Sequence, residues 1–184
     1  MKRSITVTFT MILATLSCFA QSVNRAPERS VSAVDLNRYA GQWYEIARYP
    51  NKFQDQCVGN VTATYTLKKE GRIEVINRCL EKDGTVEEAK GAAKLNKSDK
   101  TNARLKVRFA PDFISWLPQV WADYWVIDLA DDYGYAIVAT PDREYFWVLS
   151  REPKMDDATY QSVLRRAEQQ GFNPAKVVRT PQGV

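Results

Sequence analysis

The sequence predicts an all-β domain, an eight-stranded antiparallel up-and-down β-barrel with one α-helix packed outside it and a short final strand. Eight short segments of β-forming residues follow one another between residues 43 and 151. Turn-forming residues such as Asp83-Gly84 separate most of them, so neighbouring segments should pair antiparallel. Trp43 opens the first segment and Arg151 closes the last, and the two can meet only if the sheet closes on itself. A barrel of this size can enclose one small ligand.

The first twenty residues are expected to precede this domain. Lys2 and Arg3 lead into an apolar stretch that ends at the small residue Ala20, which is typical of a secretory signal peptide over residues 1–20 and too short to span a membrane. Lipidation of Cys18 is an alternative, although Thr15 stands where a bacterial lipidation signal usually has leucine. Residues 21–33 are polar and small and are expected to form a flexible leader before the domain of residues 34–184.

The charge balance of the mature chain argues against a nucleic-acid partner. Removal of residues 1–20 takes away Lys2 and Arg3 and no acidic residue, so the net charge falls from +4 to +2. Nucleic-acid-binding domains usually carry a strong basic patch, and this weak balance predicts none.

The expected strands follow from alternation and from β-branched residues. They cover residues 43–49, 61–67, 72–77, 85–94, 103–109, 124–129, 135–139 and 144–151. The connection at residues 50–59 is longer than a hairpin needs, so it could cover the mouth of the barrel. The irregular segment 110–122 is expected to pack its apolar residues on the barrel rim. The alternatives are that they line the mouth, meet a partner or touch a membrane surface. These residues are Phe113, Trp116, Leu117 and Trp121.

A helical period follows Arg151. Asp156 and Asp157 are candidates for the N-cap, and Gly171 ends the run. The apolar residues of one helix face recur at Tyr160, Val163, Leu164 and Ala167. One helix should therefore pack on the outside of the barrel, and residues 176–179 should add the short final strand.

Two cysteines, Cys57 and Cys79, remain after removal of the signal peptide. An exported protein with two cysteines favours a disulfide, and these two flank the hairpin whose turn is residues 68–71. Two free buried thiols are the alternative.

Three motifs resemble those of the lipocalin family. The first is Asn37-x-Tyr39-x-Gly41-x-Trp43-Tyr44, and the last is Leu149-Ser150-Arg151. The middle motif is the turn at residues 129–135, where Ala130-Asp131-Asp132 replaces the usual Thr-Asp-Tyr. The resemblance runs from about residue 34 to residue 178, and segments 43–48 and 145–153 are most similar to the branch of bacterial outer-membrane lipocalins and apolipoprotein D.

The resemblance implies a calyx that carries hydrophobic molecules such as fatty acids or lysophospholipids. It also implies that Trp43 plugs the closed end and that Arg151 packs across its ring, a cation–π contact that stabilises by about 0.5–2 kcal/mol. The residues with a structural role in these motifs are Gly41, Trp43, Asp131, Asp132 and Arg151.

The ligand-facing residues are predicted from strand alternation, counted from Trp43 and Arg151, and from the family alignment for residues 124–128. They are Ala47, Ala63, Tyr65, Val107, Phe109, Tyr124, Val126, Tyr145, Trp147 and Leu149, with Asp128 as a further candidate. The tyrosine hydroxyls offer a polar anchor for a head group. Glu45 shares the parity of Trp43 and is expected to form a buried ion pair near the floor. The alternative is a barrel filled solid by these side chains.

No catalytic, cofactor-binding or metal-binding residue is predicted. The chain contains no histidine, which excludes histidine-based catalytic triads and histidine-ligated zinc or haem. No glycine-rich phosphate loop precedes a helix. The expected function is non-catalytic binding, storage or transport of small hydrophobic ligands in the bacterial cell envelope.

The expected location is the periplasm or the outer membrane, with secretion into the medium as the weaker alternative. Membrane association through a lipidated Cys18 or through residues 113–121 remains open, as does a homodimer. The functional alternative is an isomerase or synthase of the same fold that acts on a lipophilic substrate, and a free Cys57 would favour it as a nucleophile.

Overall fold

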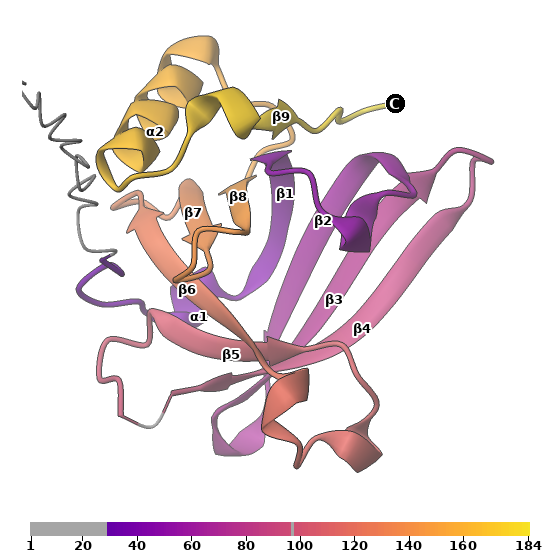
Figure 1. The fold of residues 1–184 in the computed structure, drawn as a ribbon, viewed down its shortest axis with the longest axis vertical. Helices are drawn as coiled ribbons and strands as arrows, with labels where there is room; N and C mark the ends of the chain where they lie inside the picture. The colour runs from indigo at the N-terminus through magenta and orange to yellow at the C-terminus, as the bar shows by residue number, and fades with distance from the viewer. Residues whose placement is uncertain (1–28, 97) are drawn as a thin grey trace, which may run out of the picture.

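A computed structural model describes residues 29–96 and 98–184 and confirms the closed antiparallel barrel with one helix outside it (Figure 1). The sheet order is β2-β3-β4-β5-β6-β7-β8-β1-β9, and a second pairing between β1 and β2 closes the barrel. The strands are β1 Gly41–Arg48, β2 Cys57–Leu67, β3 Arg72–Glu81, β4 Val86–Leu95, β5 Arg104–Arg108, β6 Ala122–Leu129, β7 Tyr135–Ala139, β8 Phe146–Ser150 and β9 Val178–Arg179. Within these described residues, no helix is long and apolar enough to cross a membrane.

In an up-and-down barrel, successive connections between strands alternate between the two ends. The short helices lie in or beside these connections, so each helix can be assigned to one end. The closed end carries α1 Leu36–Tyr39 and η2 Lys69–Gly71. The open end carries η1 Lys52–Gln54 between β1 and β2, and η3 Asp112–Ile114 and η4 Pro118–Val120 between β5 and β6.

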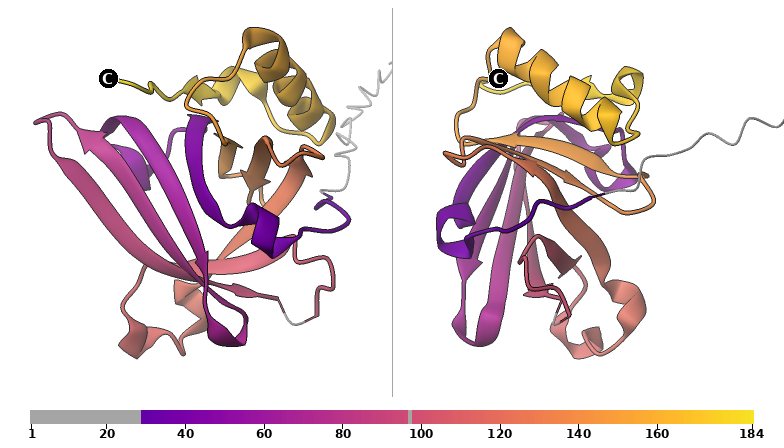
Figure 2. Two further views of the ribbon diagram at one scale, coloured as in Figure 1. Left: turned by 180° about the vertical axis from the view of Figure 1, so that it is seen from behind. Right: turned by 90° about the vertical axis from the view of Figure 1, so that its left-hand side faces the viewer.

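Helix α2 (Asp157–Gln169) lies across the outer surface of the barrel (Figure 2). Asp156 caps it by accepting a hydrogen bond from the Thr159 amide at 2.9 Å. The apolar face predicted from the sequence is buried there, and η5 Pro174–Lys176 leads from the helix to β9. The helix and the sheet share an outer cluster: Ile46, Ala47, Tyr49, Ile127, Ile137, Ala139, Phe146, Val148, Tyr160, Val163, Leu164, Ala167 and Phe172.

Two β-bulges change which side chains face the barrel interior. One interrupts the pairing of β1 with β8 between Glu45 and Ala47, and the other interrupts the pairing of β6 with β7 between Val126 and Asp128. An extra residue reverses the alternation beyond it. Ala47 therefore packs in the outer cluster, and Asp128 pairs with Arg166 of α2 at 3.0 Å. The prediction that these two side chains face inward is wrong.

The wall between β1 and β2 is completed by residues 178–184, which we call the C-terminal strap (Figure 1). Strand β1 pairs with β2 only from Gly41 to Tyr44. Above that point the Thr180 amide donates to the Ile46 carbonyl at 3.0 Å, and the Asn60 amide donates to the Pro181 carbonyl at 2.9 Å. A Cβ atom on Gly59 would lie 2.9 Å from the Pro181 carbonyl oxygen, so only glycine lets the strap approach this closely.

The disulfide between Cys57 and Cys79 is confirmed. The second and third strands extend beyond the predicted segments, β2 back to Cys57 and β3 on to Glu81, and both cysteines lie in these extensions. The bridge therefore ties the open-end halves of two neighbouring strands together.

The predicted signal peptide and Cys18 lie outside the described residues, as does the first part of the predicted leader. The last part of that leader contacts the barrel, because the Val31 amide donates to the Val126 carbonyl at 2.9 Å. Ser30 also accepts a hydrogen bond from the Arg104 side chain at 2.9 Å.

Candidate ligand-binding site

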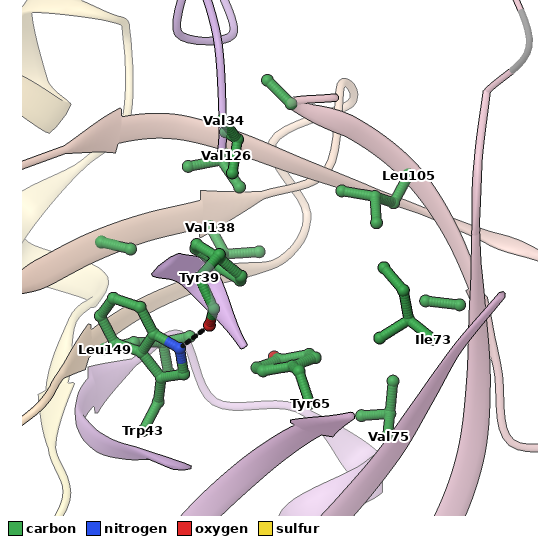
Figure 3. Close-up of a cluster of buried hydrophobic side chains, with 13 residues drawn as sticks. Val34, Tyr39, Trp43, Tyr65, Ile73, Val75, Leu105, Val126, Val138 and Leu149 are labelled. Carbon is green, nitrogen blue, oxygen red and sulfur yellow. Dashed lines mark hydrogen bonds between the residues drawn. The ribbon is translucent and has the colours of Figure 1, made fainter. Parts of the chain in front are cut away.

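The lower half of the barrel is filled by an inner cluster of buried side chains (Figure 3). They come from α1, from eight of the strands and from the residues just before α1 and β5, and they converge at the closed end because each strand turns every second side chain inward. The cluster consists of Val34, Tyr39, Trp43, Tyr65, Ile73, Val75, Ala93, Ala103, Leu105, Val126, Ala136, Val138 and Leu149.

Trp43 is fully buried in this cluster, and Arg151 covers one face of its ring. The guanidinium carbon lies 3.8 Å from the ring centroid, and the indole Nε1 donates to the Tyr39 carbonyl at 2.8 Å (Figure 3). The Arg151 guanidinium also donates to the carbonyl oxygens of Arg38, Tyr39, Ala40 and Gln42. The pair thus joins β1, α1 and the end of β8.

The turn between β6 and β7 packs beside this contact. The Asp132 carboxylate accepts from the Gly134 amide at 2.8 Å, and the Asp131 carbonyl accepts from Arg38 of α1 at 2.9 Å. The Gly134 carbonyl accepts from the Arg151 amide at 2.9 Å. Asp131 and Asp132 therefore lie at the closed end and away from the mouth.

Three tyrosines, of which Tyr39 and Tyr65 are buried and Tyr124 is partly buried, form a hydroxyl chain above the floor. The Tyr124 hydroxyl lies 2.7 Å from that of Tyr39 and 2.9 Å from that of Tyr65. Burial raises the pKa of Tyr65 to about 12, and it raises the pKa values of Tyr39 and Tyr124 well above the ordinary value. All three hydroxyls are therefore neutral at physiological pH and act as hydrogen-bonding groups.

A small cavity of about 20 Å³ adjoins this chain, with room for one water molecule. Its lining is mainly aliphatic, and the residues are Leu36, Tyr39, Ala40, Tyr65, Leu67, Ile73, Ala93, Leu105, Val107 and Tyr124. A site for a drug-sized ligand measures about 300–1,000 Å³, so this cavity alone is too small to hold such a ligand.

The wall above the cavity is half-buried although it faces the barrel interior. Ala63, Val107, Tyr124 and Trp147 pack against the inner cluster and still keep part of their surface exposed. Side chains that face inward can be exposed only where solvent reaches into the barrel. The open-end half of the barrel is therefore the accessible part of the site.

The ten predicted ligand-facing residues lie in five places. Tyr65, Val107 and Tyr124 line the cavity, and Val107 and Tyr124 also belong to the wall above it, with Ala63 and Trp147. Val126 and Leu149 are buried deep in the inner cluster. Tyr145 and Phe109 lie at the rim, where the Tyr145 ring stacks on Trp147 with 5.9 Å between centroids and Phe109 is 45% exposed. Ala47 alone lies outside the barrel, for the reason given above.

A polar network occupies the mouth beside Trp147. The Glu45 carboxylate accepts from Arg48 at 2.9 Å, from the Thr180 hydroxyl at 2.5 Å and from the Gln54 amide at 2.6 Å. Trp147 Nε1 donates to Gln54 Oε1 at 3.0 Å. Burial raises the pKa of Glu45, and these hydrogen bonds oppose the shift. Glu45 does form a buried ion pair, but the pair lies at the mouth and not near the floor.

In the segment 110–122, some aromatic residues pack against the outside of the barrel and others do not. The Trp121 ring lies between Lys94, whose Nζ is 3.8 Å from the ring centroid, and Arg108. Phe113 and Trp116 remain 79% and 76% exposed at the open end. Rim packing, the expected arrangement, thus describes Trp121 and not the two exposed aromatic residues.

Sequence reasoning missed several residues of the site. Ile73 and Val75 alternate with Arg72 and Glu74, a readable signal for an inward face. Arg48 faces inward only because of the bulge in β1, for which the sequence gives no signal.

The chain belongs to the lipocalin family. Residues 34–182 match the family described as "Lipocalin-like domain". Lipocalins bind small hydrophobic ligands, which suits a barrel with an apolar floor and an accessible upper half. The match confirms the resemblance carried by the three sequence motifs.

Relatives from distant organisms share this length of chain. The outer membrane lipoprotein Blc of Escherichia coli is 38% identical over 160 residues, covering 85% of each chain. Temperature-induced lipocalin-1 of Arabidopsis thaliana is 37% identical, covering 83% of this chain and 81% of its own. Mouse apolipoprotein D is 32% identical, covering 96% of each chain. The predicted likeness to the bacterial and apolipoprotein D branch is confirmed.

A solved structure shows the same fold. Lobster apocrustacyanin A1 superposes with a TM-score of 0.64 at 18% identity, covering 80% of this chain and 79% of its own. At this level of identity the likeness concerns the fold alone.

Proposed function

We propose that this lipocalin binds, stores or transports fatty acids, lysophospholipids or related lipids in the bacterial cell envelope, without catalysis. One observation carries the proposal: the wall of Ala63, Val107, Tyr124 and Trp147 faces the barrel interior and is reached by solvent. An acyl chain that covers this wall gains about 0.8 kcal/mol for each buried methylene. Burial of several methylenes therefore gives a useful affinity without any specific polar contact.

The envelope location is supported by the kind of relative and by the N-terminal sequence. The E. coli relative bears the name outer membrane lipoprotein, and residues 1–20 read as a secretory signal. We propose export to the periplasm or the outer membrane, with cleavage after Ala20 favoured over lipidation of Cys18.

An enzymatic role depended on a free thiol at Cys57. The disulfide with Cys79 occupies this thiol. Within the described residues nothing else favours catalysis over binding, so the proposal is a non-catalytic one.

We also propose that the open end touches a membrane surface. Phe53, Val86, Phe113 and Trp116 are each at least 64% exposed, and they lie on or directly beside three connections that share this end of the barrel. Aromatic residues are favoured at membrane–water interfaces. Contact there would place the mouth of the barrel beside the lipids that it binds.

Tryptophan fluorescence tests the binding proposal. Long-chain fatty acids or lysophospholipids should quench Trp147 with saturable, micromolar or tighter affinity, because an acyl chain along the wall contacts that ring. A Trp147→Phe variant, which should lose most of this signal, assigns it to the site. Mass spectrometry of lipids that co-purify from the native envelope identifies the natural ligand. Failure to see saturable binding across a series of acyl-chain lengths, with folding verified, would refute the proposal.

A further inference from the structure

Arg48 is a charged side chain inside the mouth of the barrel. It ends β1, and the bulge after Glu45 turns it to the inner face. Its direct partner in the pairing of β1 with β8 is Trp147, so the two side chains share a face beside the accessible wall. The Arg48 side chain is 13% exposed.

The guanidinium of Arg48 is only half used. Its Nη1 donates to Glu45 Oε1 at 2.9 Å and to the Thr180 hydroxyl at 3.1 Å. Its Nη2 reaches the Gln54 carbonyl only at 3.5 Å. The buried Nε has no acceptor among the described residues. Along the edge formed by Nε and Nη2, Nε is therefore unsatisfied and Nη2 has one long hydrogen bond.

That edge has the geometry of an oxyanion site. The N–H bonds of Nε and Nη2 point in parallel, a spacing that matches the two oxygens of a carboxylate or phosphate. A buried N–H donor without an acceptor is unfavourable. An anion that accepts from Nε forms a hydrogen bond without breaking an existing one, so the new bond contributes its whole free energy to binding.

We propose that Arg48 binds the carboxylate or phosphate oxygens of the ligand's head group. The proposal rests on the lipid-binding function and adds the class of head group and its place. With the head group at Arg48, the acyl chain extends along Trp147 toward the aliphatic cavity at the floor. The tyrosine hydroxyls, which hydrogen-bond to one another, are then not the anchor.

Glu45 sets the net charge around Arg48. It is the acidic residue that faces Arg48, while the other groups in contact, Thr180 and Gln54, are neutral. Its carboxylate balances the guanidinium and opposes a second anion. Loss of the Glu45 charge should therefore strengthen binding of an anionic lipid, an effect that a purely structural ion pair would not produce.

The test compares three probes with the same sixteen-carbon chain: hexadecanoate, 1-hexadecanol and palmitoyl lysophosphatidylcholine. Affinities are measured by fluorescence titration at pH 8, below the aggregation concentration of each probe. The wild-type protein should bind hexadecanoate, lysophosphatidylcholine or both at least about tenfold more tightly than the alcohol, the scale of a hydrogen bond to a charged group. A preference shown by one of the two probes alone tells carboxylate from phosphate, and a preference shown by both means that the site accepts either group.

Two variants give opposite expected results. Glu45→Gln should tighten binding of the preferred anionic probe severalfold and leave the alcohol unchanged. The double variant Glu45→Gln with Arg48→Gln removes both charges, so that no buried carboxylate is left unpaired, and it should abolish the preference while the alcohol still binds. Arg78→Gln, which removes an arginine paired with Glu88 outside the site, is the matched control and should change nothing.

Three results would overturn the proposal: equal affinities of all probes for the wild type, a preference that survives in the double variant, or weaker anion binding by Glu45→Gln. Binding of none of the probes by the folded wild type would instead refute the lipid-binding function itself.

Discussion

Trp43 is held on several sides at the closed end. Tyr39 accepts its indole hydrogen bond and packs its ring 5.0 Å away, while Arg151 covers the other part of the ring. Gly41, two residues earlier, has a positive φ of 96°, and a Cβ atom there would lie 3.4 Å from the Arg151 guanidinium. These residues join the first and last strands of the barrel, so they act on stability and not on the ligand.

Replacement of Trp43 by alanine should lower the free energy of unfolding by about 3–5 kcal/mol, the usual range for a large aromatic residue removed from a core. The lost indole leaves a cavity and deprives Arg151 of its partner. Chemical denaturation measures the change. Trp116→Ala removes the same side chain from an exposed position and should cost no more than about 0.5 kcal/mol. Equal losses in the two variants would contradict the role assigned to Trp43.

At the level of single elements, β1 shows how far the sequence predicts the site. Alternation placed Trp43 inside correctly, and it placed Trp147 and Leu149 of β8 on one face with Tyr145, the residue just before that strand. The bulge beyond Glu45 is specified by pairing with β8, a partner about a hundred residues away, and so local alternation could not reveal it. For that reason Ala47 was misplaced and Arg48 was overlooked. The same physical cause misplaced Asp128 on β6.

The hairpin of β2 and β3 should depend on its disulfide. The cysteines are 22 residues apart, and closing a loop of this length in the unfolded chain stabilises a protein by about 3 kcal/mol. The double variant Cys57→Ser with Cys79→Ser should lose about this amount in urea denaturation. The wild-type protein under a strong reductant serves as the control and should match the variant. An unchanged midpoint would show that strand pairing alone holds this hairpin.

The two ends of the barrel carry different kinds of features. The closed end contains the inner cluster, the Trp43–Arg151 contact and α1, whereas the open end carries the polar network, the accessible wall and the exposed aromatic residues. Stability and the proposed binding are thereby separated along the barrel axis. Substitutions at the rim should alter binding with little effect on folding.

Membrane association of the open end can be tested with lipid vesicles. The double variant Phe113→Ser with Trp116→Ser should reduce binding to vesicles of phosphatidylethanolamine and phosphatidylglycerol at least about tenfold, because each aromatic ring buried in the interface contributes about 1.5–3 kcal/mol. Co-sedimentation measures the bound fraction. Leu67→Ser, an apolar residue exposed at the closed end, is the control and should bind as the wild type does. Equal binding by all three proteins would exclude this surface.

The C-terminal strap has a consequence for how the molecule folds. Its contacts with β1 join residues as much as 137 positions apart, as between Gln182 and the Glu45 carbonyl, while the β2–β3–β4 meander needs only local hairpins. Loop closure over such a distance costs more entropy, and contacts of high sequence separation slow folding. The meander should therefore form early and the seam beside the mouth should close late. On this view Glu45 and Arg48, which the strap holds through Thr180, acquire their final geometry in the last step of folding.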